Sequence, residues 1–183
     1  ELLGRVRVDL RQQDTVTRLD NIDLQLRGLG VTGNADWQQD MGRSSFAGQL
    51  SGADIGKVLK AWGYTPTLSS NRFAVDVDMN WPGQPQQAVL TSLDGELALS
   101  LRNGQIYEVD SGARALRVFG LLNFNSIGRR LRLDFSDLFG KGLSYDHLRG
   151  KLRFEHGLVY SVEPFVLKGI SSELDLAGQV DLA

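Results

Sequence analysis

Few residues in this sequence combine the types and spacing that chemistry requires. The chain holds two histidines and no cysteine, which excludes disulfides, thiolate metal sites and cysteine nucleophiles. His147 follows Asp146, and His156 stands in a predicted hairpin turn. Because turn histidines are usually solvated, the sequence disfavours a catalytic or metal-binding role for either residue.

Two groups of carboxylates come closer to forming a site. Asp76 and Asp78 project from the same face of one predicted strand, which suits acid–base catalysis or cation binding, although a solvated outer face is the favoured interpretation. Asp134 and Asp137 precede a Gly-Lys-Gly loop, but the segment lacks the oxygen spacing of an EF-hand and the full phosphate-loop pattern. We read it as capping and turn chemistry. The sequence therefore predicts no catalytic residue, no metal site and no cofactor.

One basic cluster, Arg129, Arg130 and Arg132, is a candidate contact for phosphate, because arginine donors match phosphate oxygens in pairs. Ordinary surface charge is an equally good interpretation. With 20 lysines and arginines against 22 acidic residues, the chain has no basic excess, which disfavours nucleic acid as a partner.

Length and composition are those of one ordinary folded domain covering residues 1–183, with 42% hydrophobic and 23% charged residues. No run of about 18 apolar residues marks a membrane span. The chain begins and ends inside alternating segments, so we expect it to be a piece of a longer protein.

The dominant pattern is period-two alternation, which puts apolar side chains on one face of a sheet and polar ones on the other. It recurs near residues 6–10, 22–26, 46–50, 73–81, 97–101 and 152–154. Turn signals at 81–83, 103–104 and 155–157 favour antiparallel strands joined by hairpins. The pattern predicts a meander with one apolar and one wet face.

Helical spacing interrupts the alternation twice. Ile55, Val58, Leu59 and Trp62 follow a predicted N-cap at Asp54, and residues 115–122 repeat that spacing. The predicted fold class is therefore α+β and β-dominated: a curved antiparallel meander with two short amphipathic helices and an apolar concave face or groove. Each helix is only about 10 Å across, so together they leave part of the apolar face uncovered.

A weak internal repeat relates residues 93–99 to residues 148–154 at an offset of 55 residues (148 minus 93). It suggests a sheet extended by duplication, with sub-units at 1–92 and 93–183 as an alternative division.

The sequence also resembles the AsmA-like, YhdP-type family of Gram-negative envelope proteins. The resemblance to the C-terminal region of that family is strongest over residues 111–183, and it is carried by residues 121–124, 129–142, 145–150 and 177–183. It implies a periplasmic fragment of a long protein anchored in the inner membrane. In such a protein, an apolar groove would conduct phospholipid towards the outer membrane, and no catalytic motif would be present.

We therefore expect a non-enzymatic module that binds or conducts lipid within a phospholipid transport bridge between the two membranes, with phospholipid acyl chains as its partner. The alternative is a structural or docking module that binds an outer-membrane or periplasmic protein. A glycan hydrolase acting through Asp76 and Asp78 is strongly disfavoured. The expected lipid-binding residues are the apolar members of the alternating strands: Phe73, Val75, Val77, Leu97, Leu99, Leu101, Leu131, Leu133, Phe135, Leu152 and Phe154.

Overall fold

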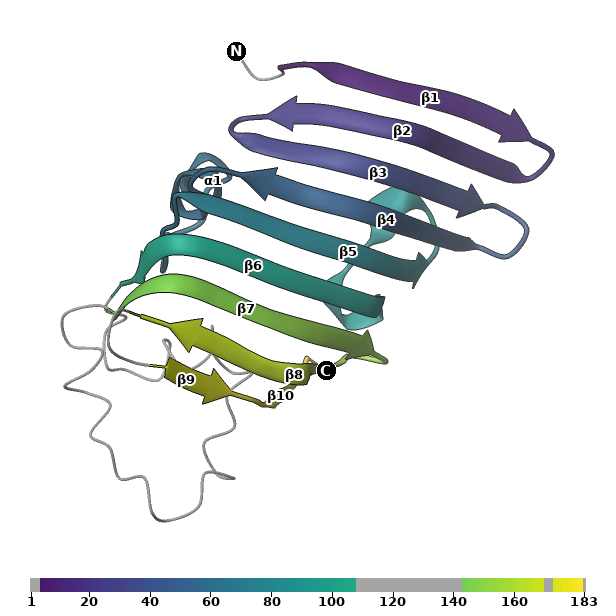
Figure 1. Cartoon of the computed structure of the whole chain (residues 1–183). Coiled ribbons are helices and arrows are strands. Elements are labelled where there is room, and N and C mark those ends of the chain that lie inside the picture. The colour runs from purple at the N-terminus through teal and green to yellow at the C-terminus, as the bar shows by residue number, and fades with distance from the viewer. Residues whose placement is uncertain (1–3, 108–142, 170–172, 183) are drawn as a thin grey trace.

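The computed structural model describes residues 4–107, 143–169 and 173–182, and these form one open sheet of ten strands (Figure 1). Strands β1 to β8 follow one another in chain order, β10 pairs with β8 at the far edge, and β9 also pairs with β8. All pairs run antiparallel. The strands are β1 (Val6–Gln13), β2 (Val16–Leu26), β3 (Leu29–Gln38), β4 (Arg43–Gly52), β5 (Arg72–Pro82), β6 (Asp94–Ile106), β7 (Leu143–Glu155), β8 (Leu158–Lys168), β9 (Glu173–Leu176) and β10 (Gln179–Asp181).

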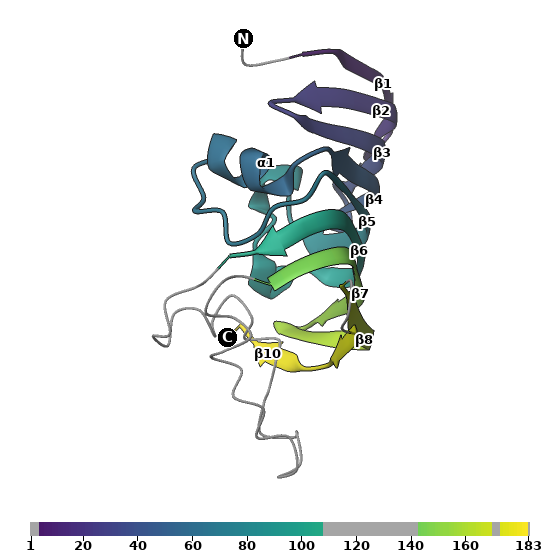
Figure 2. The same cartoon turned by 60° about the vertical axis from the view of Figure 1, so that its left-hand side comes forward.

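The prediction of a β-dominated antiparallel meander is confirmed. Figure 2 shows that the sheet bends towards the side on which α1 (Ile55–Ala61) lies. The short 3-10 turns η1 (Pro85–Gln87) and η2 (Leu90–Ser92) lie on the same side. The second predicted helix, at 115–122, and the predicted strand residues Leu131, Leu133 and Phe135 fall outside the described residues.

Helix α1 begins where the sequence predicted. The Asp54 carboxylate accepts hydrogen bonds from the backbone amides of Gly56, at 2.9 Å, and Lys57, at 3.4 Å. Gly63, with a positive φ of 87°, follows the helix end at a place that favours glycine. The side chain of Val58 is buried against the sheet.

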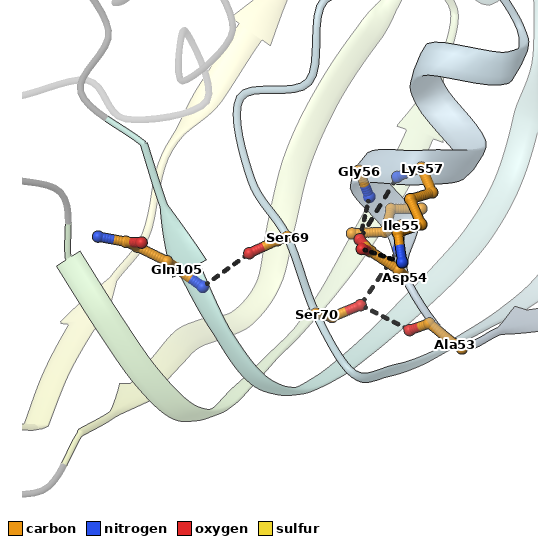
Figure 3. A network of polar contacts seen from close by, with 8 residues as sticks. All are labelled: Ala53, Asp54, Ile55, Gly56, Lys57, Ser69, Ser70 and Gln105. Atoms are coloured by element: carbon orange, nitrogen blue, oxygen red, sulfur yellow. Dashed lines mark hydrogen bonds and ion pairs between the residues drawn. The ribbon is translucent and has the colours of Figure 1, made fainter.

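Two neighbouring serines, of which Ser70 is buried, connect the start of α1 to the sheet (Figure 3). The Ser70 hydroxyl donates to the carbonyl of Ala53, at 3.0 Å, and accepts from the Ile55 amide, at 3.2 Å. One residue earlier, the Ser69 hydroxyl accepts from the Gln105 amide on β6, at 3.3 Å. Because these bonds satisfy backbone groups where β4 ends and α1 begins, they fix the position of the helix over β5 and β6.

Two clusters of buried side chains form the core on the α1 side of the sheet. The first lies beneath α1 and includes Val58, Phe73 and Leu101. The second gathers Met79, Trp81 and Phe154 at the opposite end of the strands. Val77, Leu97 and Phe165 are partly buried and pack against both clusters, so they connect the two.

The predicted turn at Asn103 and Gly104 is wrong, because both residues lie inside β6, which continues to Ile106. Asn103 has a φ of 46°, a left-handed value that asparagine tolerates, and it produces a local irregularity without ending the strand. By contrast, the predicted turn before Gly157 is a true hairpin. His156 and Gly157, with φ of 51° and 82°, join β7 to β8.

Tyr145 is a buried phenol that connects β7 to the segment preceding β5. Its hydroxyl donates to the carbonyl of Ser69, at 2.5 Å. Burial is the largest cause that raises the pKa of Tyr145 to about 12, with smaller contributions from Asp54 and Tyr107. The folded protein therefore holds Tyr145 in its neutral form at every ordinary pH.

Replacing Asp54 with alanine should lower the free energy of unfolding by about 1 kcal/mol, because two amides of the first helical turn lose their acceptor. Urea unfolding followed by circular dichroism measures the change. Asp40→Ala is the control, since Asp40 is an exposed loop residue whose carboxylate accepts from the neighbouring Met41 amide. An unchanged Asp54→Ala midpoint would show that the cap does not hold the helix.

Tyr145 should make the protein less stable as the pH rises from 10 towards 12. The pKa of this group is higher in the folded than in the unfolded chain, so its contribution is complete below pH 10 and is lost as the pH approaches 12. Tyr145→Phe should unfold more easily at pH 8, by about 1 kcal/mol for the lost hydrogen bond, yet lose less stability between pH 9 and pH 11. Urea titrations at these pH values test this, with the exposed Tyr64→Phe as control. Equal slopes for wild type and Tyr145→Phe would contradict it.

Candidate functional site

The side of the sheet that carries α1 presents rows of apolar residues that run across the strands. We call this side the apolar face. Its residues stand directly opposite one another in the ladders, so one row passes through six consecutive strands without a polar side chain. In order from β1 to β6, this row is Val6, Leu24, Val31, Leu50, Val75 and Leu99.

A second row runs parallel to the first. It starts at Leu10 and reaches Val159 on β8. In order, its members are Leu10, Leu19, Ala35, Phe46, Met79, Gly95, Phe154 and Val159. The apolar face is therefore continuous from one edge of the sheet almost to the other.

A β-bulge keeps the second row in place. Leu19 and Ile22 are three residues apart, which in a regular strand would put them on opposite faces. The ladder shifts between them, so that Leu19 faces Ala35 while Ile22 faces Gly33. Asn21, with a φ of 52°, takes the irregular position in the bulge. Its backbone amide donates to the side-chain oxygen of Asn34, at 3.1 Å.

Coverage of the apolar face changes along the sheet. Under α1, Phe73 and Leu101 are only 2% and 1% exposed. On β1, by contrast, Val6 and Leu10 are 54% and 66% exposed. The apolar face therefore divides into a packed part beneath α1 and an open part at the β1 end.

The structure brings together the described members of the predicted lipid-binding set, because all of them lie on the apolar face of β5, β6 and β7. They are Phe73, Val75, Val77, Leu97, Leu99, Leu101, Leu152 and Phe154. Their burial separates them into two groups. Phe73 and Leu101 belong to the packed core, whereas Val77, Leu97 and Leu99 remain partly accessible. Leu131, Leu133 and Phe135 lie outside the described residues.

Sequence reasoning missed part of the open face. Val31 on β3 was not predicted as a lipid contact, because its neighbours on the same face, Gly33 and Ala35, are small and weaken the alternation. Its place between Leu24 and Leu50 in the ladder makes it part of the apolar row. The alternation of the neighbouring strands β2 and β4 was the signal in the sequence that could have identified Val31 as part of the row.

Gly150 breaks the first row on β7, where it stands opposite Leu99. A Cβ atom at Gly150 would overlap the ring of Phe165, which comes from β8. The phenyl ring therefore fills the space above the glycine and continues the apolar surface.

The opposite side of the sheet, which we call the polar face, carries the predicted carboxylate pair Asp76 and Asp78. Asp76 and Asp78 are both exposed there, and the Asp76 carboxylate accepts from the Gln49 amide, at 2.7 Å. Within residues 4–107, 143–169 and 173–182, no group of three or more potential ligands could hold a metal ion. Among these same residues, no helix has the length and apolar character needed to cross a membrane.

The predicted phosphate contacts, Arg129, Arg130 and Arg132, lie outside the described residues. The predicted turn residue His156 is exposed, and its amide donates to the Asp94 carboxylate, at 3.2 Å.

Comparison with known proteins gives a consistent result. The chain is 28% identical over 181 residues to a protein of Escherichia coli (strain K12) named intermembrane phospholipid transporter YhdP. This match covers 98% of the chain but only 14% of that relative. No solved structure matches. The family model described as YhdP protein matches residues 1–183, and the chain therefore belongs to the YhdP family.

Proposed function

We propose that the apolar face binds phospholipid acyl chains and that this chain is a non-enzymatic, lipid-conducting module of a longer envelope protein. The observation that carries the proposal is the unbroken apolar row from Val6 to Leu99, which stays in register across six strands. Burying an acyl CH₂ group contributes about 0.8 kcal/mol, so such a surface holds a lipid tail without specific polar contacts.

The family supports the same proposal. The Escherichia coli relative is named an intermembrane phospholipid transporter, and the present chain spans about one seventh of its length. We infer that the longer protein sits in the envelope of a Gram-negative bacterium, with its anchor in the inner membrane. The apolar face would then form one stretch of a groove between the membranes.

The most probable lipid contacts are the accessible members of the apolar face. These are Val77, Leu97 and Leu99 in the middle of the sheet and Leu24 and Val31 towards β1. Phe73 and Leu101 would support this surface from within the core, because α1 covers them.

A docking module for another envelope protein is the second candidate. It is favoured by the apolar side chains of β1, where Val6, Val8 and Leu10 are all accessible. Large exposed apolar surfaces are as typical of protein interfaces as of lipid sites. The two functions differ in whether purified protein alone carries lipid.

A photo-crosslinking residue placed along β6 should report lipid with a period of two. Positions 97 and 99 lie on the apolar face and should give phospholipid adducts, whereas 98 and 100 lie on the polar face and should give none. Position 101 should also give none, because Leu101 is 1% exposed. Mass spectrometry of the adducts formed in the full-length protein in cells provides the measurement. Adducts at all five positions, or at none, would contradict the proposal.

A substitution on the open part of the apolar face should weaken lipid uptake. Val31→Asn puts an amide into the apolar row, and Thr32→Asn puts the same amide on the polar face one residue later. We expect bound phospholipid to fall by about tenfold in Val31→Asn, equivalent to about 1.4 kcal/mol, and to remain unchanged in Thr32→Asn.

Native mass spectrometry and uptake of a fluorescent phospholipid measure the effect, and circular dichroism shows whether each variant is folded. Wild-type protein that folds but takes up no lipid would refute the proposal. If Val31→Asn then also lost a protein partner, the docking function would replace it.

A further inference from the structure

The polar face carries a row of basic residues that is invisible in the linear sequence. Arg72 on β5 stands directly opposite Arg102 on β6, and Arg102 stands opposite His147 on β7. His147 in turn stands opposite Lys168 on β8. Their side chains point away from the apolar face, because the neighbours Phe73, Leu101, Leu148 and Leu167 are buried on it.

This arrangement costs stability in the isolated chain. Like charges directly opposite in a ladder repel one another, whereas an alternation of signs would attract. Among the described residues, neither Arg72 nor Arg102 has an acidic side chain within ion-pair distance. The row is therefore short of negative charge.

Arg149 adds a third guanidinium without an ion-pair partner among the described residues. It lies two residues beyond His147 on the same face, opposite Ser100 and diagonal to Arg102. The nearby lysines are already engaged. Lys151 pairs with Glu96, at 2.7 Å, and holds the pKa of that carboxyl below its ordinary value, while Lys168 pairs with Glu173, at 2.9 Å.

A shallow pocket of about 630 Å³ opens beside this row. Small residues, Ala98, Ser100 and Gly150, leave space in its lining, and His147 and Arg149 also line it. Glu163 is the one acidic residue of the lining without an ion-pair partner in the described part of the chain. With the ion pairs taken as neutral, Arg149 and His147 share this lining with one unpaired glutamate, and Arg72 and Arg102 lie beside it in the row.

His147 gives a second indication at the same place. Its Nδ1 atom is buried and has no hydrogen-bond partner among the described residues. A covered ring nitrogen without a partner is uncommon in folded proteins, and a bound ion or water is one of the features that explain it.

We propose that Arg72, Arg102, His147 and Arg149 form a binding site for a phosphate group. Guanidinium groups bind phosphate oxygens in pairs through charge-assisted hydrogen bonds, and the ladders place three arginines on one face, at opposite or diagonal positions of β5, β6 and β7. The site lies on the polar face, so it is separated by the sheet from the surface proposed to hold acyl chains. A lipid headgroup at a membrane surface and a soluble phosphate ester share this chemistry.

Two probes test the site in the intact chain: glycerol 3-phosphate followed by NMR titration, and phosphatidylglycerol vesicles followed by flotation. The test variant is Arg72→Gln combined with Arg102→Gln. The control is Arg5→Gln combined with Arg7→Gln, which removes the same charge from exposed positions at the β1 end. We expect the test variant to weaken glycerol 3-phosphate binding by about tenfold and the control to change it by less than about twofold.

Vesicle binding identifies the source of the phosphate. Loss of flotation in the test variant alone would assign the site to lipid headgroups, and unchanged flotation with lost glycerol 3-phosphate binding would assign it to soluble phosphates. The proposal is overturned if wild-type protein binds neither probe, or if the control variant loses as much binding as the test variant. Uptake of lipid tails is measured separately, so failure here leaves the proposed function standing.

Discussion

Backbone hydrogen bonds between antiparallel strands hold this protein in one register, and both faces of the sheet depend on that register. A slip of one residue between β4 and β5 would place Phe46 opposite Asp78 in place of Met79 and mix charges into the apolar rows. The packed clusters beneath α1 and at the opposite strand ends penalise such a slip, because each relies on large side chains from several strands meeting on one face. The ladder and the core therefore stabilise each other.

The sequence revealed much of this arrangement because alternation is a local signal. Residues 73–81 and 97–101 alternate so regularly that their strands, their inward side chains and the meander could all be predicted. The start of β2 could not, since the bulge at Asn21 shifts the period between Leu19 and Ile22. The register of β8 could not be predicted for a related reason: the ladder between β7 and β8 shifts twice between Arg149 and Leu152, and Pro164 interrupts the pattern of β8.

The candidate sites differ in how visible they were. The apolar residues of β5 and β6 were found from alternation, but their division into core and accessible surface depends on where α1 lies, which a one-dimensional pattern does not contain. The basic row was not found. Arg72, Arg102 and His147 are separated by 30 and 45 residues (102 minus 72, and 147 minus 102), so only strand pairing makes them neighbours.

The continuous apolar rows also bear on movement. A hydrocarbon chain lying along the first row meets a valine or leucine on each strand from β1 to β6, spaced by the roughly 4.8 Å that separates neighbouring strands. As the hydrocarbon chain slides, each CH₂ group that loses contact with one side chain gains contact with the next. The roughly 0.8 kcal/mol lost per group is therefore nearly balanced by the free energy regained. The free-energy profile along the sheet is therefore shallow. Under the proposed function, a lipid would cross such a surface with little friction, and conditions at the two ends of the path would set the direction of net flow.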